Sequence, residues 1–303
     1  MWKTLLWLML GLAPSSARPA PPITYIDQPS RIVPADYVAA WPSLAPYIAR
    51  LGAGSRAQVK ADLQHLAGET SSAGALNLLA QLEREDGQLD ESEAAIERAI
   101  RLEPKQHRHY FQLAMVLFAR LTRASGLGRW RWHRRTVDAY QKAFDLDPSP
   151  APYRIYLIYG FLNTPGFAGG DKDLALRLAD DGVKMGEKEF YVVRADVHRM
   201  REENAASFSD YDRAIEERIF KLSSFLSAAR FAMEREEWLR VDQYTQWAVH
   251  CRPDDPRTHE ALGDYYLATG DIRAAASAFE EALRIDPQSS SAREKLARSR
   301  GQK

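Results

Sequence analysis

The chain has 303 residues, 45% of them hydrophobic, so it is long enough to bury a sizeable core. Its 41 basic and 41 acidic residues cancel at pH 7, which argues against a general nucleic-acid binder, because such proteins concentrate a basic excess on one domain. Cys251 is the only cysteine, which excludes an internal disulfide and a multi-cysteine metal site. We expect it to be a half-buried small side chain; the alternative is an intermolecular disulfide.

The first 17 residues have the pattern of a secretory signal peptide. Lys3 precedes an apolar run from Leu5 to Ala13, and the small residues Ser15 and Ala17 follow. The apolar run is too short to span a bilayer stably. The pattern predicts cleavage near Ala17 and export to the bacterial periplasm. The alternative is an uncleaved segment that anchors the protein in the inner membrane.

Two segments precede the first clear pattern of helix pairs. Residues 18–34 contain five prolines and predict an extended linker. Residues 35–70 predict N-terminal capping helices. Their first part is interrupted by Pro42 and Pro46 and gives at best two helical turns, whereas residues 55–67 carry a stripe of apolar side chains typical of a helix.

The strongest pattern is a pair of short helices joined by a tight turn, at Pro256–Pro287, with an earlier echo at Ala75–Pro104. In both, a Leu is followed by a small residue, a Gly comes seven residues later, and an Ala precedes a Pro by five residues. Small residues let two antiparallel helices approach closely, and the Pro ends the second helix. These positions are Leu79, Ala80, Gly87, Ala99 and Pro104 in one unit and Leu262, Gly263, Gly270, Ala282 and Pro287 in the other.

The segment Pro256–Pro287 resembles a tetratricopeptide repeat, because Tyr266, Ala275 and Phe279 also fit that family's pattern. More degenerate units lie between the two clear ones, at 110–148, 153–182, 187–221 and 225–253. The resemblance covers roughly residues 71–290, which we take as the repeat array.

The resemblance implies an all-α fold, a right-handed solenoid of stacked antiparallel helix pairs. No single pair can bury its apolar face alone, so stacked neighbours form the core. Asp271 follows Gly270 and is expected to cap the second helix of its pair. Residues 291–303 predict a C-terminal capping helix that ends in a polar tail.

Two turns are longer than the repeat needs, at Arg123–Arg135 and Asn163–Lys172. In the second, Gly169 and Gly170 permit unusual backbone angles and Asp171 is placed to cap the next helix, so we interpret it as a structural turn.

The first lengthened turn combines cationic and aromatic side chains that can contact anionic groups. The alternative is that its tryptophans pack on a neighbouring turn while its arginines are solvated or paired with acidic side chains. The residues of this predicted contact are Arg129, Trp130, Arg131, Trp132, Arg134 and Arg135.

The sequence contains no His-Glu-x-x-His, Gly-x-Ser-x-Gly or phosphate-loop motif. His107 and His109 are two residues apart, so on a helix they point to different faces and do not converge on a metal. We therefore predict no catalytic residue, no cofactor and no metal site, and a protein that is not an enzyme.

In this repeat family the first helix of each pair lines the concave face, and transferring that register predicts a groove with an apolar middle and polar ends. Such a groove suits an extended or helical peptide with apolar anchors. The alternative is that Phe118, Ile155 and Leu162 belong to the core between repeats. The predicted groove residues are Asn77, Gln81, Arg84, Phe111, Met115, Phe118, Ile155, Tyr159, Leu162 and Arg230, with Met233, Glu260 and Asp264 beyond them.

The sequence thus predicts a non-catalytic scaffold in the periplasm that binds a protein or peptide partner, and no nucleic acid, in its concave groove. One alternative is an assembly factor attached to the membrane or envelope, with a peripheral contact through the Arg/Trp-rich segment. The second is a repeat-bearing enzyme without a recognisable motif.

Overall fold

The computed structural model describes residues 23–26, 34–69, 71–125 and 128–301. The predicted signal peptide at 1–17 and most of the predicted linker at 18–34 lie outside these residues.

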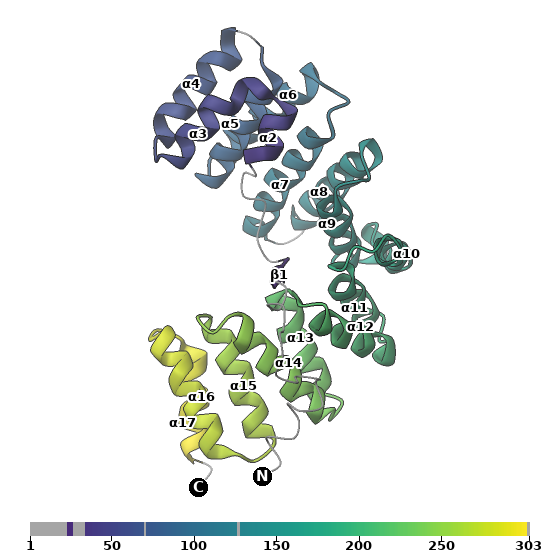
Figure 1. The fold of residues 1–303 in the computed structure, drawn as a ribbon, viewed down its shortest axis with the longest axis vertical. Coiled ribbons are helices and arrows are strands. Elements are labelled where there is room, and N and C mark those ends of the chain that lie inside the picture. Colours follow the sequence, from purple (N-terminus) through teal and green to yellow (C-terminus); the bar gives the residue numbers. More distant parts are fainter. Residues whose placement is uncertain (1–22, 27–33, 70, 126–127, 302–303) are drawn as a thin grey trace, which may run out of the picture.

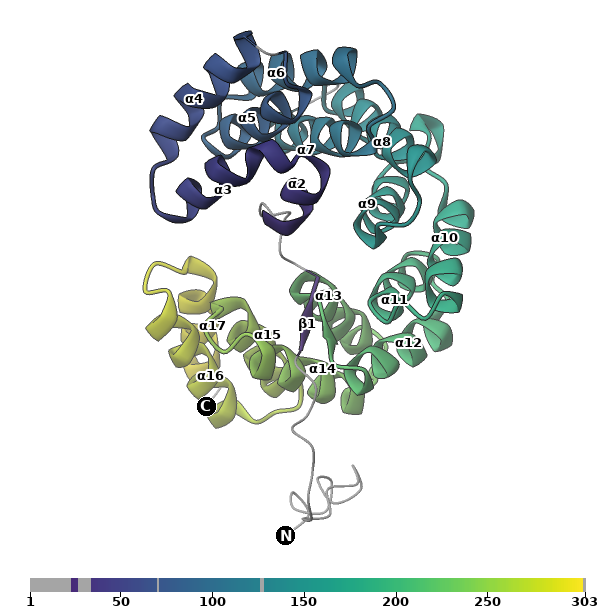
Figure 2. The same cartoon turned by 45° about the horizontal axis from the view of Figure 1, so that its top comes forward.

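In the part of the chain that the structure describes, six helix pairs follow one another around an arc (Figures 1 and 2). The two helices of each pair contact each other and, except between the fourth and fifth pairs, the second helix contacts the first helix of the next pair. The pairs are α5 (Ala73–Glu85) with α6 (Leu89–Leu102), α7 (His107–Arg123) with α8 (Gly128–Leu146), α9 (Ala151–Leu162) with α10 (Lys172–Lys184), α11 (Phe190–Met200) with α12 (Asn204–Glu216), α13 (Leu222–Met233) with α14 (Trp238–Cys251), and α15 (Pro256–Ala268) with α16 (Ile272–Ile285).

Both ends of the array are covered by further helices. Helix α17 (Ser290–Gly301) packs on α16. At the other end, α4 (Arg56–Glu69) packs on α5, and it follows α2 (Pro34–Ala40), the 3-10 turn η1 (Pro42–Leu44) and α3 (Ala45–Gly52). The predicted all-α solenoid of stacked antiparallel pairs is confirmed. The apolar core continues along the array in successive clusters and has no single centre, as expected for stacked repeats.

The last pair shows why the repeat residues are needed. Ala275 and Ala282 are fully buried, and a Cβ on Gly263 would come within 2.4 Å of the Phe279 ring. Gly270 turns the chain with a φ of 82°, a left-handed conformation that glycine adopts without strain. Asp271 then caps α16 by accepting a hydrogen bond from the Ala274 N–H at 3.0 Å. The predicted close approach, turn and cap are confirmed.

Two local predictions differ from the structure. Pro42 and Pro46 each lie in the first turn of a helix, where no intrahelical N–H donor is needed, so residues 34–52 are more helical than expected. The segment Arg123–Arg135 is not an extended turn, because α8 begins at Gly128 and most of the Arg/Trp-rich residues occupy its first two turns.

Part of the predicted linker forms a strand on the inner side of the arc. Strand β1 (Thr24–Tyr25) pairs in parallel with β2 (Ile219–Phe220), between α12 and α13. The Thr24 N–H donates to the Arg218 carbonyl at 3.0 Å, and the Ile26 N–H donates to the Phe220 carbonyl at 2.9 Å. Figure 2 shows β1 and α2 inside the arc of helix pairs. The chain therefore contributes its own N-terminal residues to its concave side.

Among the described helices, none is both long and apolar enough to cross a membrane.

Candidate functional site: the concave surface

The concave surface of the first pair is covered by the protein's own α2. The Tyr37 hydroxyl lies 2.8 Å from both the Asn77 and Gln81 side-chain oxygens, and all three residues are buried. Asn77 and Gln81 are predicted groove residues, and α2 already covers both of them. Arg84, one turn further along α5, is partly buried, with its guanidinium 3.9 Å from the Glu85 carboxylate.

Trp41, directly after α2, holds this cover in place. Its indole stacks on His109, with 5.4 Å between ring centroids, and fills the space beside Gly74, where a Cβ would come within 2.4 Å of the indole. Trp41 Nε1 donates to Glu103 Oε2 at 3.4 Å, and His109 Nε2 lies 3.2 Å from the same oxygen. The contact is thus both packed and hydrogen-bonded.

His109 joins Trp41 to Asn77. Its Nδ1 lies 2.8 Å from Asn77 Nδ2, so a neutral ring accepts from the amide and donates to Glu103 through Nε2. Burial lowers the pKa of His109 in spite of the nearby Glu103 carboxylate. The covering contact is therefore built around a neutral histidine.

The predicted apolar anchors in the middle of the array are mostly packed inside the fold. Phe111 stacks on Tyr153 at 4.6 Å between ring centroids, and the sulfur of Met115 accepts from the Tyr140 hydroxyl at 3.4 Å. Ile155 and Leu162 are buried, as the core interpretation proposed for them, whereas Phe118 is 45% exposed. Among these residues, only Phe118 presents a large apolar surface to solvent.

Tyr159 is bound to a buried carboxylate that the sequence did not reveal. Asp196 is 2% exposed and accepts hydrogen bonds from the Tyr159 and Tyr211 hydroxyls, each at 2.6 Å, and one from Ser224. Burial alone would raise the pKa of the Asp196 carboxyl, but Lys221 and the hydrogen bonds hold it below its usual range. This group ties α9, α11, α12 and α13 together, so Tyr159 has a structural role.

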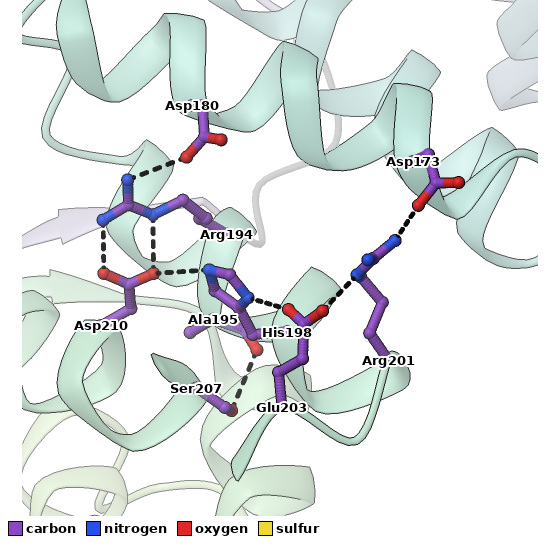
Figure 3. Close-up of polar contacts among 9 residues, drawn as sticks. All are labelled: Asp173, Asp180, Arg194, Ala195, His198, Arg201, Glu203, Ser207 and Asp210. Atoms are coloured by element: carbon purple, nitrogen blue, oxygen red, sulfur yellow. Dashed lines mark hydrogen bonds and ion pairs between the residues drawn. The ribbon is translucent and has the colours of Figure 1, made fainter. Parts of the chain in front are cut away.

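A second polar network joins α10, α11 and α12 (Figure 3). Arg194 binds Asp210 through two nitrogens, each at 2.7 Å, and Asp180 at 3.0 Å. His198 Nδ1 lies 2.5 Å from Glu203, and its Nε2 lies 3.8 Å from Asp210. Each of these carboxylates has a cationic or histidine partner, which is the arrangement of a structural network.

Glu203 also accepts from Arg201, which pairs in turn with Asp173, so the network extends to the start of α10 (Figure 3). Among the described residues, no group of three or more His, Cys, Asp or Glu side chains is placed to hold a metal ion.

The concave surface at the C-terminal end is open. A groove of about 630 Å³ lies between α13, α15 and α17. Its apolar lining includes Leu226, Met233 and Leu267. Of the predicted groove residues, Arg230, Met233, Glu260 and Asp264 line this space, whereas α17 adds Ser291, Lys295 and Arg298, which the repeat register did not indicate.

Some charged side chains of this groove have a partner within the fold, and others do not. Lys295 Nζ lies 2.7 Å from Asp264 and 3.5 Å from Glu260, and Glu260 also accepts from Ser291 at 2.6 Å. Both carboxylates are therefore neutralised or hydrogen-bonded within the fold. Arg230 and Arg298 are exposed and have no ion-pair partner among the described residues. The groove thus combines an apolar floor with two unpaired guanidinium groups.

The Arg/Trp-rich segment divides into a packed part and an exposed part. Trp132 is partly buried, with the guanidinium carbons of Arg120 and Arg135 at 5.2 and 5.1 Å from its ring centroid. Arg135 also pairs with Glu93 at 2.7 Å. Trp132 is thus packed and Arg135 paired within the fold, which is the alternative that the sequence left open for this segment. The remaining four residues are exposed: Arg129, Trp130, Arg131 and Arg134.

The comparisons identify the repeat. Residues 73–106 and residues 256–299 each match a model of the tetratricopeptide repeat. No curated protein matches the chain. The chain thus contains tetratricopeptide repeats at these two places, with four further helix pairs between the two matching units.

Several solved structures share the fold. A chain of the APC/C hetero-tetramer Cut9–Hcn1 is 12% identical, with a TM-score of 0.59 over 88% of this chain and 51% of that one. PilW, a widely conserved type IV pilus biogenesis factor, is 13% identical, with a TM-score of 0.56 over 74% of this chain and 98% of PilW. PilF of Pseudomonas aeruginosa is 15% identical, with a TM-score of 0.53 over 76% and 99%. The present chain spans about half the length of the Cut9–Hcn1 chain. At sequence identities this low, the similarity shows only that the fold is shared.

Proposed function

We propose that this tetratricopeptide-repeat protein is a non-catalytic scaffold that binds a segment of a partner protein in its C-terminal groove. The observation that carries the proposal is the pair of unpaired arginines, Arg230 and Arg298, beside an apolar floor. A partner segment that places apolar side chains on Leu226 and Met233 and a carboxylate near the arginines would satisfy both features. The expected ligand is therefore an acidic, amphipathic peptide segment.

The rest of the concave surface supports this choice of site. Asn77 and Gln81 are covered by α2, and Met115, Ile155 and Leu162 are buried in the core. A partner that used those residues would have to displace or unfold parts of the protein, at a cost in binding free energy. The C-terminal groove demands no such rearrangement.

We also propose that binding takes place outside the cytoplasm, in a bacterial periplasm. The support for this is the signal-peptide pattern of residues 1–17. Intact-mass measurement of the protein from its native host tests it, with a mature chain that begins after Ala17 as the expected result. A chain in the cytoplasm that still begins at Met1 would contradict the location without affecting the groove.

Selection of peptides tests the groove. A phage-displayed peptide library is selected on the wild-type protein, and the affinities of the selected peptides are measured by fluorescence anisotropy. We expect acidic residues next to apolar ones in the selected sequences. The double variant Arg230→Glu with Arg298→Glu should bind these peptides at least tenfold more weakly, because two attractive charges become repulsive.

Arg273→Glu is the matched control. Arg273 is an exposed arginine of α16 without an ion-pair partner among the described residues, and it lies outside the groove. This variant should bind like the wild type. Failure to select any peptide, or equal binding by the double variant and the wild type, would refute the proposed site.

A further inference from the structure

The two lengthened turns of the sequence meet in space and form one edge of the molecule. His133 Nδ1 lies 2.9 Å from Thr164 Oγ1, and the ring of Trp130 contacts that of Phe167 in an edge-to-face arrangement, with 6.2 Å between centroids. Val137 packs against Gly160, where a Cβ would come within 3.0 Å of its side chain. The start of α8 and the turn at 163–172 are thus joined by packing and a hydrogen bond.

Phe167 is presented to solvent by a fixed turn. It lies in the 3-10 turn η2 (Gly166–Ala168), which ends at Gly169 in a left-handed conformation with a φ of 100°. At Gly170 a Cβ would come within 1.8 Å of the Thr164 carbonyl oxygen, so the turn closes tightly on itself. Phe167 is nevertheless 87% exposed, and Trp130 is 37% exposed. Phe167 therefore contributes little to the core, and its ring together with that of Trp130 forms an exposed aromatic pair.

The same edge carries arginines that lack ion-pair partners. Arg129, Arg131 and Arg134 are exposed, and none has an ion pair with an acidic side chain among the described residues. Trp130, Arg131 and Arg134 lie on one face of α8, and the exposed Asp138, one turn beyond Arg134, is the nearest acidic residue on that face. Arg129 precedes Trp130 and lies on the other side of it. We call Trp130, Phe167 and these three arginines the aromatic edge.

Other arginines nearby do have partners, so the lack of ion pairs is specific to these three arginines. Arg120 and Arg135 both lie 2.7 Å from the Glu93 carboxylate, and both pack on Trp132. The Glu93 carboxylate of α6 is therefore already used. The three arginines of the aromatic edge outnumber the single nearby carboxylate, Asp138, and leave a net positive charge on this edge.

We propose that the aromatic edge docks on an anionic lipid bilayer. Trp rings are favoured at the membrane–water interface, Phe rings insert at the boundary with the acyl chains, and each arginine near an anionic surface adds an attraction. Two rings and three cations are few for a stable interface with a protein, which takes roughly 20–30 residues a side. They suffice for a peripheral, salt-dependent contact with lipid. This contact is separate from the C-terminal groove, so a docked protein keeps its peptide site free.

A fluorophore placed beside Phe167 tests the contact in the full-length chain. Gly166 is exposed, and a side chain there meets nothing within 4 Å, so Gly166→Cys provides an attachment site for an environment-sensitive dye. The native Cys251 is buried, and burial raises the pKa of its thiol to about 12, which limits background labelling. Ser277→Cys, at an exposed position of α16, gives the matched control.

We expect the dye at position 166 to show a blue-shifted, brighter emission with phosphatidylglycerol vesicles and little change with phosphatidylcholine vesicles. The dye at position 277 should not respond. Changing Arg129, Arg131 and Arg134 to Gln should weaken the response roughly a hundredfold in lipid concentration, about fivefold for each charge. Phe167→Ser should weaken it further, and higher salt should weaken it in the wild type.

Three results would overturn the proposal: no response at position 166 with anionic vesicles, equal responses at positions 166 and 277, or an unchanged response in the triple Gln variant. Attachment through the N-terminal segment alone would give one of these results, because neither the position of the dye nor the arginines would then matter. Circular dichroism of each variant checks that the fold is retained.

Discussion

The two halves of the array share one repeat geometry but differ in what covers their concave surface. In the N-terminal half, Tyr37 and Trp41 of the protein's own chain pack on α5 and α7, where Tyr37 bonds to Asn77 of α5 and Trp41 bonds to Glu103 between α6 and α7. In the C-terminal half, the groove beside Arg230 is open. A helix-pair register therefore locates a concave surface but does not show whether the chain itself already covers it.

The largest expected effect is on the covered half. Trp41→Ala removes the indole from its place beside Gly74 and His109, and truncation of a packed tryptophan costs about 3 kcal/mol. Hydrogen exchange should rise strongly in α2 and in the first turns of α5 and α7. Because each repeat contacts only its neighbours, exchange in α15 and α16 should stay as in the wild type. An equal rise in both halves would show that the cover is not local.

The next prediction concerns the core of the C-terminal half, whose groove is open. Ala282 is fully buried where α15 and α16 touch, so Ala282→Leu should overpack that contact and lower the free energy of unfolding by about 2 kcal/mol. Denaturant unfolding measures the loss, and hydrogen exchange should place it in the last two pairs. An unchanged unfolding curve would mean that the repeat register is wrong.

A smaller effect is expected when only the hydrogen bonds between α2 and α5 are removed. Tyr37→Phe deletes the hydroxyl that bonds to Asn77 and Gln81 and leaves a buried oxygen without its donor, at a cost of about 1 kcal/mol. Tyr47→Phe is the control, because Tyr47 lies on the neighbouring α3 and its hydroxyl has no hydrogen bond among the described residues. Equal losses in urea unfolding for the two variants would argue that the Tyr37 hydroxyl is not a specific contact.

Acid should loosen the covered half first. Burial lowers the pKa of His109, so below the unfolded-state value of about 6.5 the unfolded chain takes up a proton that the folded protein resists. The stability from this group is therefore present above about pH 6.5 and is lost as the pH falls towards the lowered value. His107 and His133, whose pKa values burial also lowers, add to the effect.

Exchange in α2 and α7 should therefore rise between pH 7.5 and pH 5.5, after correction for the intrinsic pH dependence of exchange, and α15 should change less. His109→Asn, which cannot take up the proton, should show a smaller pH response. A response in α15 as large as that in α7 would contradict this account.

The sequence identified the repeat scaffold well because its determinants are local. Gly263, Ala275 and Ala282 require close helix contact, and Gly270 and Asp271 specify a turn and a cap within a few residues. The covering of the concave surface depends on contacts over long separations in the chain. Tyr37 lies 40 residues from Asn77, and the two meet only because α2 folds back on the array.

The prediction of binding residues was limited for the same reason. Transfer of the family register placed Gln81 and Tyr159 on the inner surface, but the partner of Tyr159 is Asp196, 37 residues away on α11. Arg298 and Lys295 were missed because α17 lies outside the repeat motif yet completes the groove. The pair Tyr37 and Trp41, four residues apart and hence on one helical face, was the available signal for a docked segment.

Thiol accessibility at two concave positions shows whether the protein covers the N-terminal part of its own concave surface. Gln81→Cys lies under α2, and Arg230→Cys lies in the open groove, while the buried native Cys251 contributes a slow background. Alkylation rates under native conditions should be much higher for Arg230→Cys than for Gln81→Cys, and adding Trp41→Ala should raise the rate only at position 81. Equal rates at the two positions in the otherwise wild-type chain would contradict the claim that the N-terminal concave surface is covered by the protein itself.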